Sequence, residues 1–122
     1  MGKVAVLKRK GDFDRVFRQG KRYRGRALTL ACVGRPEGAL RAAFVAGKAV
    51  GGAVRRNRQR RRLREAFRQL APPTELPADL VFVAQPAAAK VAFTALSREM
   101  ATLLRRAGLL PTSERSVHEA AP

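Results

Sequence analysis

Hydrophobic residues recur along this chain in three helical patterns. Within residues 53–70, four side chains follow the spacing i, i+3, i+4, i+7, which predicts a helix with one narrow apolar face: Leu63, Ala66, Phe67 and Leu70. Apolar residues repeat at helical spacing over 90–107 until Gly108, which predicts a helix packed on a core. A shorter helix is expected within residues 11–20, where Asp12 can cap its start and Gly20 can end it.

Apolar runs predict strands between these helices. The runs at 27–33 and 40–46 flank a turn containing proline and glycine, so an antiparallel hairpin is expected there. The run at 79–86 stops at Pro86 and is typical of a central strand buried on both faces. This order predicts an α/β (α+β) two-layer sandwich, with one domain over 1–107 and a loosely ordered tail over 108–122.

The charge of the chain is strongly positive. Its 122 residues contain 26 Lys and Arg against 9 Asp and Glu, which gives a formal net charge of +17. Eight arginines lie between Arg55 and Arg68 on the 53–70 helix, and Glu65 is the only acid there. Like charges four residues apart repel each other, so this helix is expected to need an anionic partner.

Nucleic acid fits this helix better than a membrane surface. Guanidinium groups bind phosphates with paired donors and stack on bases, whereas the apolar stripe is too thin for a membrane-surface helix. Beside that stripe, one ridge of polar side chains is expected from Asn57, Arg61, Arg64 and Arg68. The stripe continues toward the helix start as Arg56, Gln59 and Arg60, while the opposite flank carries Arg55, Arg58 and Arg62.

The short N-terminal helix places Phe13, Val16 and Phe17 on one face. Two interpretations remain open for the phenylalanines: packing on a sheet, or stacking on bases. The segment GKAVGGAV (47–54) lacks the order of a P-loop, although helix-start N–H groups with Lys48 nearby can meet a phosphate.

Other chemistry is sparse. Cys32 is the only cysteine and His118 the only histidine, so an internal disulfide is impossible and a metal site on the protein is not expected. No clustered carboxylates indicate a protein active site. Because no apolar run reaches the length of a membrane span and the first residues lack a signal-peptide core, a cytoplasmic protein without membrane contact is expected.

The segment KAVGGAVRRNRQRRRLREAFR resembles the signature of the bacterial ribonuclease P protein component, and Arg56, Asn57 and Arg58 match its Arg-Asn-Arg core. The resemblance extends to LKRKGDFDRVFRQG, to DLVFVAQPAAA and to the terminal helix, covering roughly residues 7 to 107. It implies a fold similar to ribosomal S5 domain 2, with an unusual left-handed βαβ crossover.

The resemblance also implies a function. The RNA subunit of such a holoenzyme performs the hydrolysis, and the protein binds both that catalytic RNA and the 5′ leader of precursor tRNA. The protein alone is expected to bind no cofactor, Mg²⁺ being held mainly by RNA and used better when the protein is present. A monomer in a 1:1 complex with the RNA is expected.

By position, a leader cleft between the first helix and the sheet would be lined by Phe13, Phe17 and Lys48. The arginine helix would contact RNA through Arg55, Arg56, Asn57, Arg58, Arg60, Arg61, Arg64 and Arg68. The chain departs from the family pattern at Gly47, where relatives often have Lys or Arg, and at Gly52, where they usually have Asn. Strand 27–33 also lacks the aromatic that some relatives direct into the cleft.

Two other functions share some of these features. A ribosomal or other structured-RNA binding protein has similar size and charge, and binding that depends on a 5′ leader would separate it from the first interpretation. A free-standing nuclease is disfavoured by the single histidine and the lack of clustered carboxylates.

Overall fold

The computed structural model describes residues 5–73 and 75–111, so most of the predicted tail, residues 112–122, lies outside the described part. The helices are α1 (Lys10–Gln19), α2 (Ala53–Leu70) and α3 (Phe93–Arg106), with short 3₁₀ helices η1 (Lys48–Val50) and η2 (Pro86–Lys90). The strands are β1 (Ala5–Val6), β2 (Lys21–Arg24), β3 (Leu28–Gly34), β4 (Arg41–Ala46) and β5 (Ala78–Ala84).

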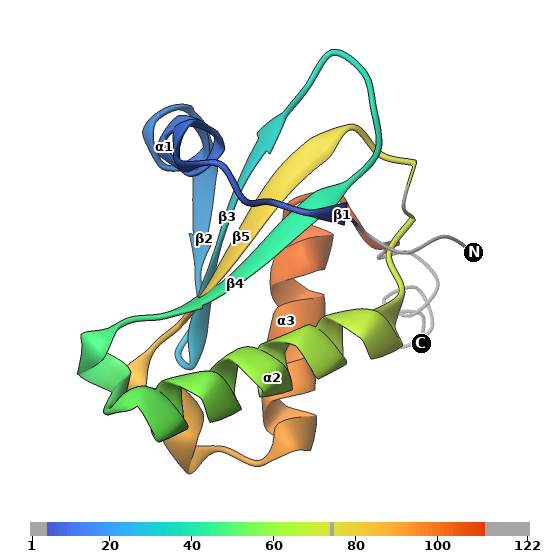
Figure 1. The fold of residues 1–122 in the computed structure, drawn as a ribbon. Helices are drawn as coiled ribbons and strands as arrows, with labels where there is room; N and C mark the ends of the chain where they lie inside the picture. The colour runs from blue at the N-terminus through green and yellow to red at the C-terminus, as the bar shows by residue number, and fades with distance from the viewer. Residues whose placement is uncertain (1–4, 74, 112–122) are drawn as a thin grey trace, which may run out of the picture.

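The strands form one mixed sheet in the order β1-β4-β5-β3-β2. β5 lies at its centre, parallel to β4 and antiparallel to β3. This arrangement confirms that the 79–86 run is a buried central strand, since five of its seven residues are buried consecutively. β4, α2 and β5 form a parallel βαβ unit whose crossover is left-handed, the rarer hand for such connections (Figure 1).

The predicted hairpin of 27–33 and 40–46 is wrong. Both runs are strands, but β5 inserts between them and pairs with each. An apolar run indicates that a strand is buried, but it does not indicate which strand lies next to it in the sheet. Both strands that flank a central strand are themselves buried, so their runs look alike. The edge strands β1 and β2 were not predicted, since β1 has two residues and β2 has the largely polar sequence KRYR.

Helices cover both faces of the sheet. α2 and α3 pack on one face, and the shorter α1 packs on the other (Figure 1). The larger core lies under α2 and α3, where the rings of Phe44, Phe67 and Phe82 stack or meet at an angle with centroids 5.3–5.7 Å apart. The smaller core lies under α1 and centres on Val16, Ala31 and Val81.

The helix termini differ in part from their predictions. α3 ends as expected before Gly108, whose φ of +79° suits the left-handed turn that glycine favours. α1 starts at Lys10, two residues before Asp12, and its N-cap is Arg9. Asp12 therefore lies in the first turn, where one carboxylate oxygen is 3.5 Å from Nη2 of Arg41 on β4. Within the described part of the chain, no helix is long and apolar enough to cross a membrane.

Candidate nucleic-acid interface

The predicted polar ridge of α2 is on the protein surface. Asn57, Arg61, Arg64 and Arg68 are all exposed, as are Arg55 and Arg58 on another side of the helix. Leu63, Ala66 and Phe67 are buried against the larger core and Leu70 is half-buried, which confirms the apolar stripe. Toward the helix start the stripe turns polar as predicted, with Gln59 buried and Arg56 and Arg60 half-buried.

Little negative charge offsets this ridge. Glu65 lies on the same helix and bonds to the guanidinium of Arg68 and to Nε2 of Gln69. The hydrogen bonds from Arg68 and Gln69 hold the pKa of Glu65 below its ordinary value. The partners of Glu65 lie near the C-terminal end of α2, so the positive charge of the N-terminal two-thirds of the helix is not neutralised by this acid. The guanidinium carbon of Arg64 lies 5.7 Å from the centre of the Phe44 ring, a cation–π contact that orients this group while the side chain stays exposed.

Arg62 departs from its predicted place on the free flank with Arg55 and Arg58. Its Nη1 donates to Oε1 of Gln59 at 2.8 Å and to the carbonyl of Ala88 at 2.6 Å, and its Nη2 donates to the carbonyl of Val91 at 2.6 Å. Burial, and then the nearby charge of Arg58, lowers its pKa. Arg62 thus ties η2 to α2. Its distance in sequence from these carbonyls explains why the helical pattern did not reveal this role.

The start of α2 presents backbone donors beside Lys48. Gly52 is the N-cap and has no side chain to accept from the first turn, and its carbonyl accepts from the N–H of Arg56 at 2.9 Å. Lys48 is exposed on η1, and its carbonyl accepts from the N–H of Gly51 at 3.1 Å. A Cβ added at Gly47 or Gly52 would meet no atom within 4 Å, so neither glycine is required by packing.

Phe13 and Phe17 lie on the opposite side of the sheet. Both are half-buried and pack on the smaller core under α1. The guanidinium of Arg22 lies 5.3 Å from the ring centre of Phe17, and its Nη2 donates to the carbonyl of Phe17 at 3.3 Å. The predicted cleft residues are therefore divided: the two phenylalanines are on α1, whereas Lys48 lies with the start of α2.

A row of half-exposed side chains crosses the sheet on this same face. Val45 pairs with Val83, Val83 with Thr29, and Thr29 with the exposed Arg24 in the strand register. Nε2 of Gln85 donates to Oγ1 of Thr29 at 3.1 Å at the edge of the row. We call this row the α1-side floor. It is apolar in the middle, basic at one end, and free of the strand aromatics Phe44 and Phe82, which belong to the other core.

Arg22, Arg24 and the floor residues are not among the site residues that the sequence predicts. A signal for the arginines was present, because Arg22 and Arg24 alternate in KRYR and must share a face if that segment is a strand. The floor had no such signal. Whether a Val or Thr in a buried run is covered depends on the length of α1, which stops at Gln19 and leaves that part of the sheet open.

The position of α1 is fixed by buried charge. Asp79 of β5 is fully buried, and its Oδ2 accepts a 2.7 Å bond from Nη2 of Arg15 on α1. Arg35 lies 3.1 Å from its Oδ1, and Arg41 approaches both oxygens. Burial alone would raise the pKa of Asp79, but the bonds and charge of Arg41, with the charges of Arg35 and Arg15, more than offset it and lower that pKa.

These carboxylates do not fit a magnesium site, which needs oxygen ligands facing a cation. Asp12 and Asp79 both face the guanidinium of Arg41, and Oε2 of Glu99 accepts from the N–H groups of Ala27 and Leu28. Across the part of the chain described here, no three His, Cys, Asp or Glu side chains gather in a metal-binding arrangement.

Comparison with known proteins identifies the family. A family model described as Ribonuclease P matches residues 1–108. The ribonuclease P protein component of Chloroflexus aurantiacus is 41% identical over 112 residues, covering 91% of this chain and 83% of that protein. The one from a Roseiflexus species is 39% identical over 115 residues, covering 93% and 94%.

Solved structures share the fold. The RNase P protein of Staphylococcus aureus superposes with a TM-score of 0.76 at 22% identity, covering 89% of this chain and all of that one. The RNase P protein of Thermotoga maritima superposes with a TM-score of 0.71 at 24% identity, covering 83% and 96%. With the family model matched over nearly the whole described chain, the protein belongs to the ribonuclease P protein component family.

Proposed function

We propose that this chain serves as the protein subunit of ribonuclease P, the endoribonuclease that removes the 5′ leader from precursor tRNA, and that the hydrolysis itself occurs on the RNA subunit. One observation carries the proposal beyond family membership. The protein presents two basic surfaces on opposite faces of one sheet: the arginine ridge of α2 on one, and the α1-side floor with Arg22 and Arg24 on the other.

The arginine helix suits a structured RNA. Asn57, Arg61 and Arg64 form an exposed ridge, and Arg55 and Arg58 add charge on another side near the helix start. Guanidinium groups in fixed rows can bind successive phosphates of a folded backbone, and uncapped N–H groups at the start of α2 can bind a further phosphate oxygen. We assign this surface to the catalytic RNA.

The α1-side floor suits a flexible single strand. Such a strand is bound by a positive groove that follows its phosphates and by flat or apolar surfaces that accept any base. Arg22 and Arg24 supply the charge, and Val45, Val83 and the accessible part of Phe17 supply the surface. Arg22 already covers one side of the Phe17 ring. A base would therefore add to the contact between Arg22 and Phe17 and would not displace Arg22. We assign this surface to the 5′ leader.

Two RNAs held on opposite faces of a chain with net charge +17 repel each other less than they would alone. The protein would therefore lower the Mg²⁺ concentration needed for catalysis, with the ions held mainly by RNA. Arg15, Asp12 and the other charged groups around Asp79 would contribute by holding α1 in place. We propose a 1:1 complex of this chain with the RNA, acting in the cytoplasm.

The leader assignment is tested by measuring the affinity of the reconstituted holoenzyme for precursor tRNAs with leaders of increasing length and for mature tRNA. We expect the protein to increase affinity for leader-bearing tRNA only, with the gain growing until the leader spans the floor. An equal gain for mature tRNA would instead support a general structured-RNA binder of the ribosomal type.

A further inference from the structure

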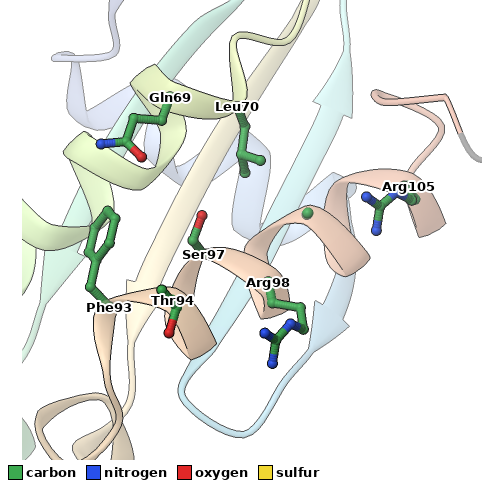
Figure 2. Close-up of a pocket in the computed structure, with 8 residues that line it drawn as sticks. Gln69, Leu70, Phe93, Thr94, Ser97, Arg98 and Arg105 are labelled. Carbon is green, nitrogen blue, oxygen red and sulfur yellow. The ribbon is translucent and has the colours of Figure 1, made fainter. Parts of the chain in front are cut away.

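A groove lies between the last turn of α2 and the outer face of α3, on the side of the sheet away from α1 (Figure 2). Its volume is about 370 Å³. Phe93 and Gln69 face each other at one end, Arg105 lies at the other, and Thr94, Ser97 and Arg98 lie along α3 between them. The spacing of α3 predicted core packing alone for this helix, and none of these residues belongs to the two basic surfaces above.

Two arginines, Arg98 and Arg105, line the groove. Arg98 is exposed and Arg105 half-exposed, and neither guanidinium forms an ion pair with any residue that the structure describes. The single acid on each of the two helices already has partners: Glu65 bonds to Arg68 and Gln69, and Glu99 accepts from the backbone at the start of β3. Arg105 is seven positions after Arg98, so the two lie about 10 Å apart along the helix axis.

The groove also offers the groups that recognise a base. Phe93 is half-buried, with its ring at the groove wall, and aromatic rings accept any base by stacking. The hydroxyls of Thr94 and Ser97 can donate to or accept from a base edge or a ribose 2′-OH. An aromatic wall beside hydroxyl groups and two guanidinium groups that pair with no acid among the described residues is a combination suited to unpaired RNA.

We propose that this groove binds an unpaired segment of the catalytic RNA, with a base stacked on Phe93 and phosphates at Arg98 and Arg105. The inference rests on the proposed function. The leader is assigned to the opposite face of the sheet, whereas the groove adjoins α2, the helix assigned to the catalytic RNA. The RNA subunit would then contact α2 along most of its length and continue onto α3.

The test measures affinity of the full chain for ribonuclease P RNA without tRNA, over a range of salt concentrations. Arg98→Gln with Arg105→Gln should weaken binding and reduce the salt slope by roughly one to two units. Phe93→Leu keeps an apolar side chain in the core and should weaken binding about fivefold to a hundredfold with an unchanged slope, since stacking releases no counterions. Lys8→Gln with Arg18→Gln, exposed charges outside the groove, is the matched control for net charge.

The arms separate the possible failures. Groove variants that bind like the Lys8/Arg18 control, while Arg61→Ala with Arg64→Ala weakens binding, would overturn the groove alone. If neither the groove variants nor the Arg61/Arg64 variant weakens RNA binding, both the groove inference and the proposed function fail. A photo-crosslinker at Thr94, in the holoenzyme with precursor tRNA present, gives a second reading from a chain that keeps Phe93, Arg98 and Arg105. Crosslinks to the RNA subunit support the inference, and crosslinks to the leader or to a second copy of the protein overturn it.

Discussion

Arg41 binds both carboxylate oxygens of Asp79, donating from Nε to Oδ1 and from Nη2 to Oδ2 at 2.8 Å each. The two residues face each other across the parallel pair β4 and β5, in direct register. Arg15 brings α1 to the same carboxylate, so one buried acid connects two strands and the helix beside the proposed leader surface.

Asp79→Asn should therefore destabilise the fold. The substitution removes the charge that balances three guanidinium groups, and breaking a buried ion pair by removing one partner costs about 3–5 kcal/mol. The free energy of unfolding in urea measures this loss. Asp14→Asn is the control, because among the described residues Asp14 pairs only with the exposed Lys10, and its loss should cost about 0.5 kcal/mol or less. A similar small loss for both variants would contradict the account.

The same carboxylate predicts acid sensitivity. The pKa of Asp79 lies below its ordinary value of 3.8, so the folded state resists protonation more than the unfolded state does. Its contribution to stability is then complete above pH 3.8 and decreases as the pH falls toward the lower folded pKa. We expect the difference in unfolding free energy between wild type and Asp79→Asn to shrink below that pH. A constant difference across the acid range would argue against the lowered pKa.

Two adjacent arginines of α2 should behave oppositely. Arg62→Ala leaves the carbonyls of Ala88 and Val91 without their donor and should cost about 1–3 kcal/mol of stability. Arg61→Ala removes an exposed side chain and should leave the unfolding free energy within about 0.5 kcal/mol while weakening RNA binding. Thermal melts and RNA-binding titrations on both variants measure the contrast. Equal stability of the two variants would contradict a stabilising role for the hydrogen bonds from Arg62 to η2 and Val91.

The polar ridge of α2 predicts a change in salt dependence. Arg61→Ala with Arg64→Ala should weaken binding to the catalytic RNA and reduce the slope of log affinity against log salt by roughly one unit or less per lost phosphate contact. Filter binding at several salt concentrations gives the slope. An unchanged slope would count against phosphate contact by this ridge.

Phe17→Leu should affect only the leader. Leucine keeps apolar contact with the smaller core, but it removes the ring that Arg22 covers. Affinity for leader-bearing tRNA should fall by about 1–3 kcal/mol, the value of one stacked base, with mature tRNA unaffected. Equal losses on both RNAs would contradict the assignment of Phe17 to the leader surface.

The adjacent glycines before α2 should tolerate substitution differently. Gly52 is an N-cap with φ −73° and open space at its Cβ position, so Gly52→Asn should stabilise the protein by a few tenths of a kcal/mol. Gly51 has φ +139°, and a Cβ there would lie 2.7 Å from Cδ of Arg55. Gly51→Asn should lower the melting temperature. The prediction fails if both variants melt alike.

The sequence was most informative where a periodic pattern is long. The apolar stripe of α2, the end of α3 at Gly108 and the burial of β5 all follow from spacing alone. Strand order did not follow, because Leu28–Gly34 and Arg41–Ala46 are both apolar enough to flank a central strand and neither contains information on which strand lies between them. The start of α1 was missed because Arg9 caps it without a side-chain bond.

Site residues followed the same division. The exposed ridge was predictable because helical geometry places Asn57, Arg61 and Arg64 together once the apolar stripe is known. Arg62 bonds to carbonyls of distant residues, and Asp79 contacts three distant arginines. These partners are 26 to 64 residues apart in the sequence, so a local pattern of residues cannot reveal them. The separation of Lys48 from Phe13 and Phe17 likewise follows from the sheet order. Their assignment to RNA remains a prediction.

The central claim is that this chain is the protein subunit that assists a catalytic RNA. Single-turnover cleavage of a precursor tRNA at low magnesium tests it most directly, comparing a bacterial ribonuclease P RNA alone, this protein alone, and the two combined. We predict rapid removal of the leader only in the combined sample. Cleavage by the protein alone, or no stimulation of the RNA by the protein, would contradict the account.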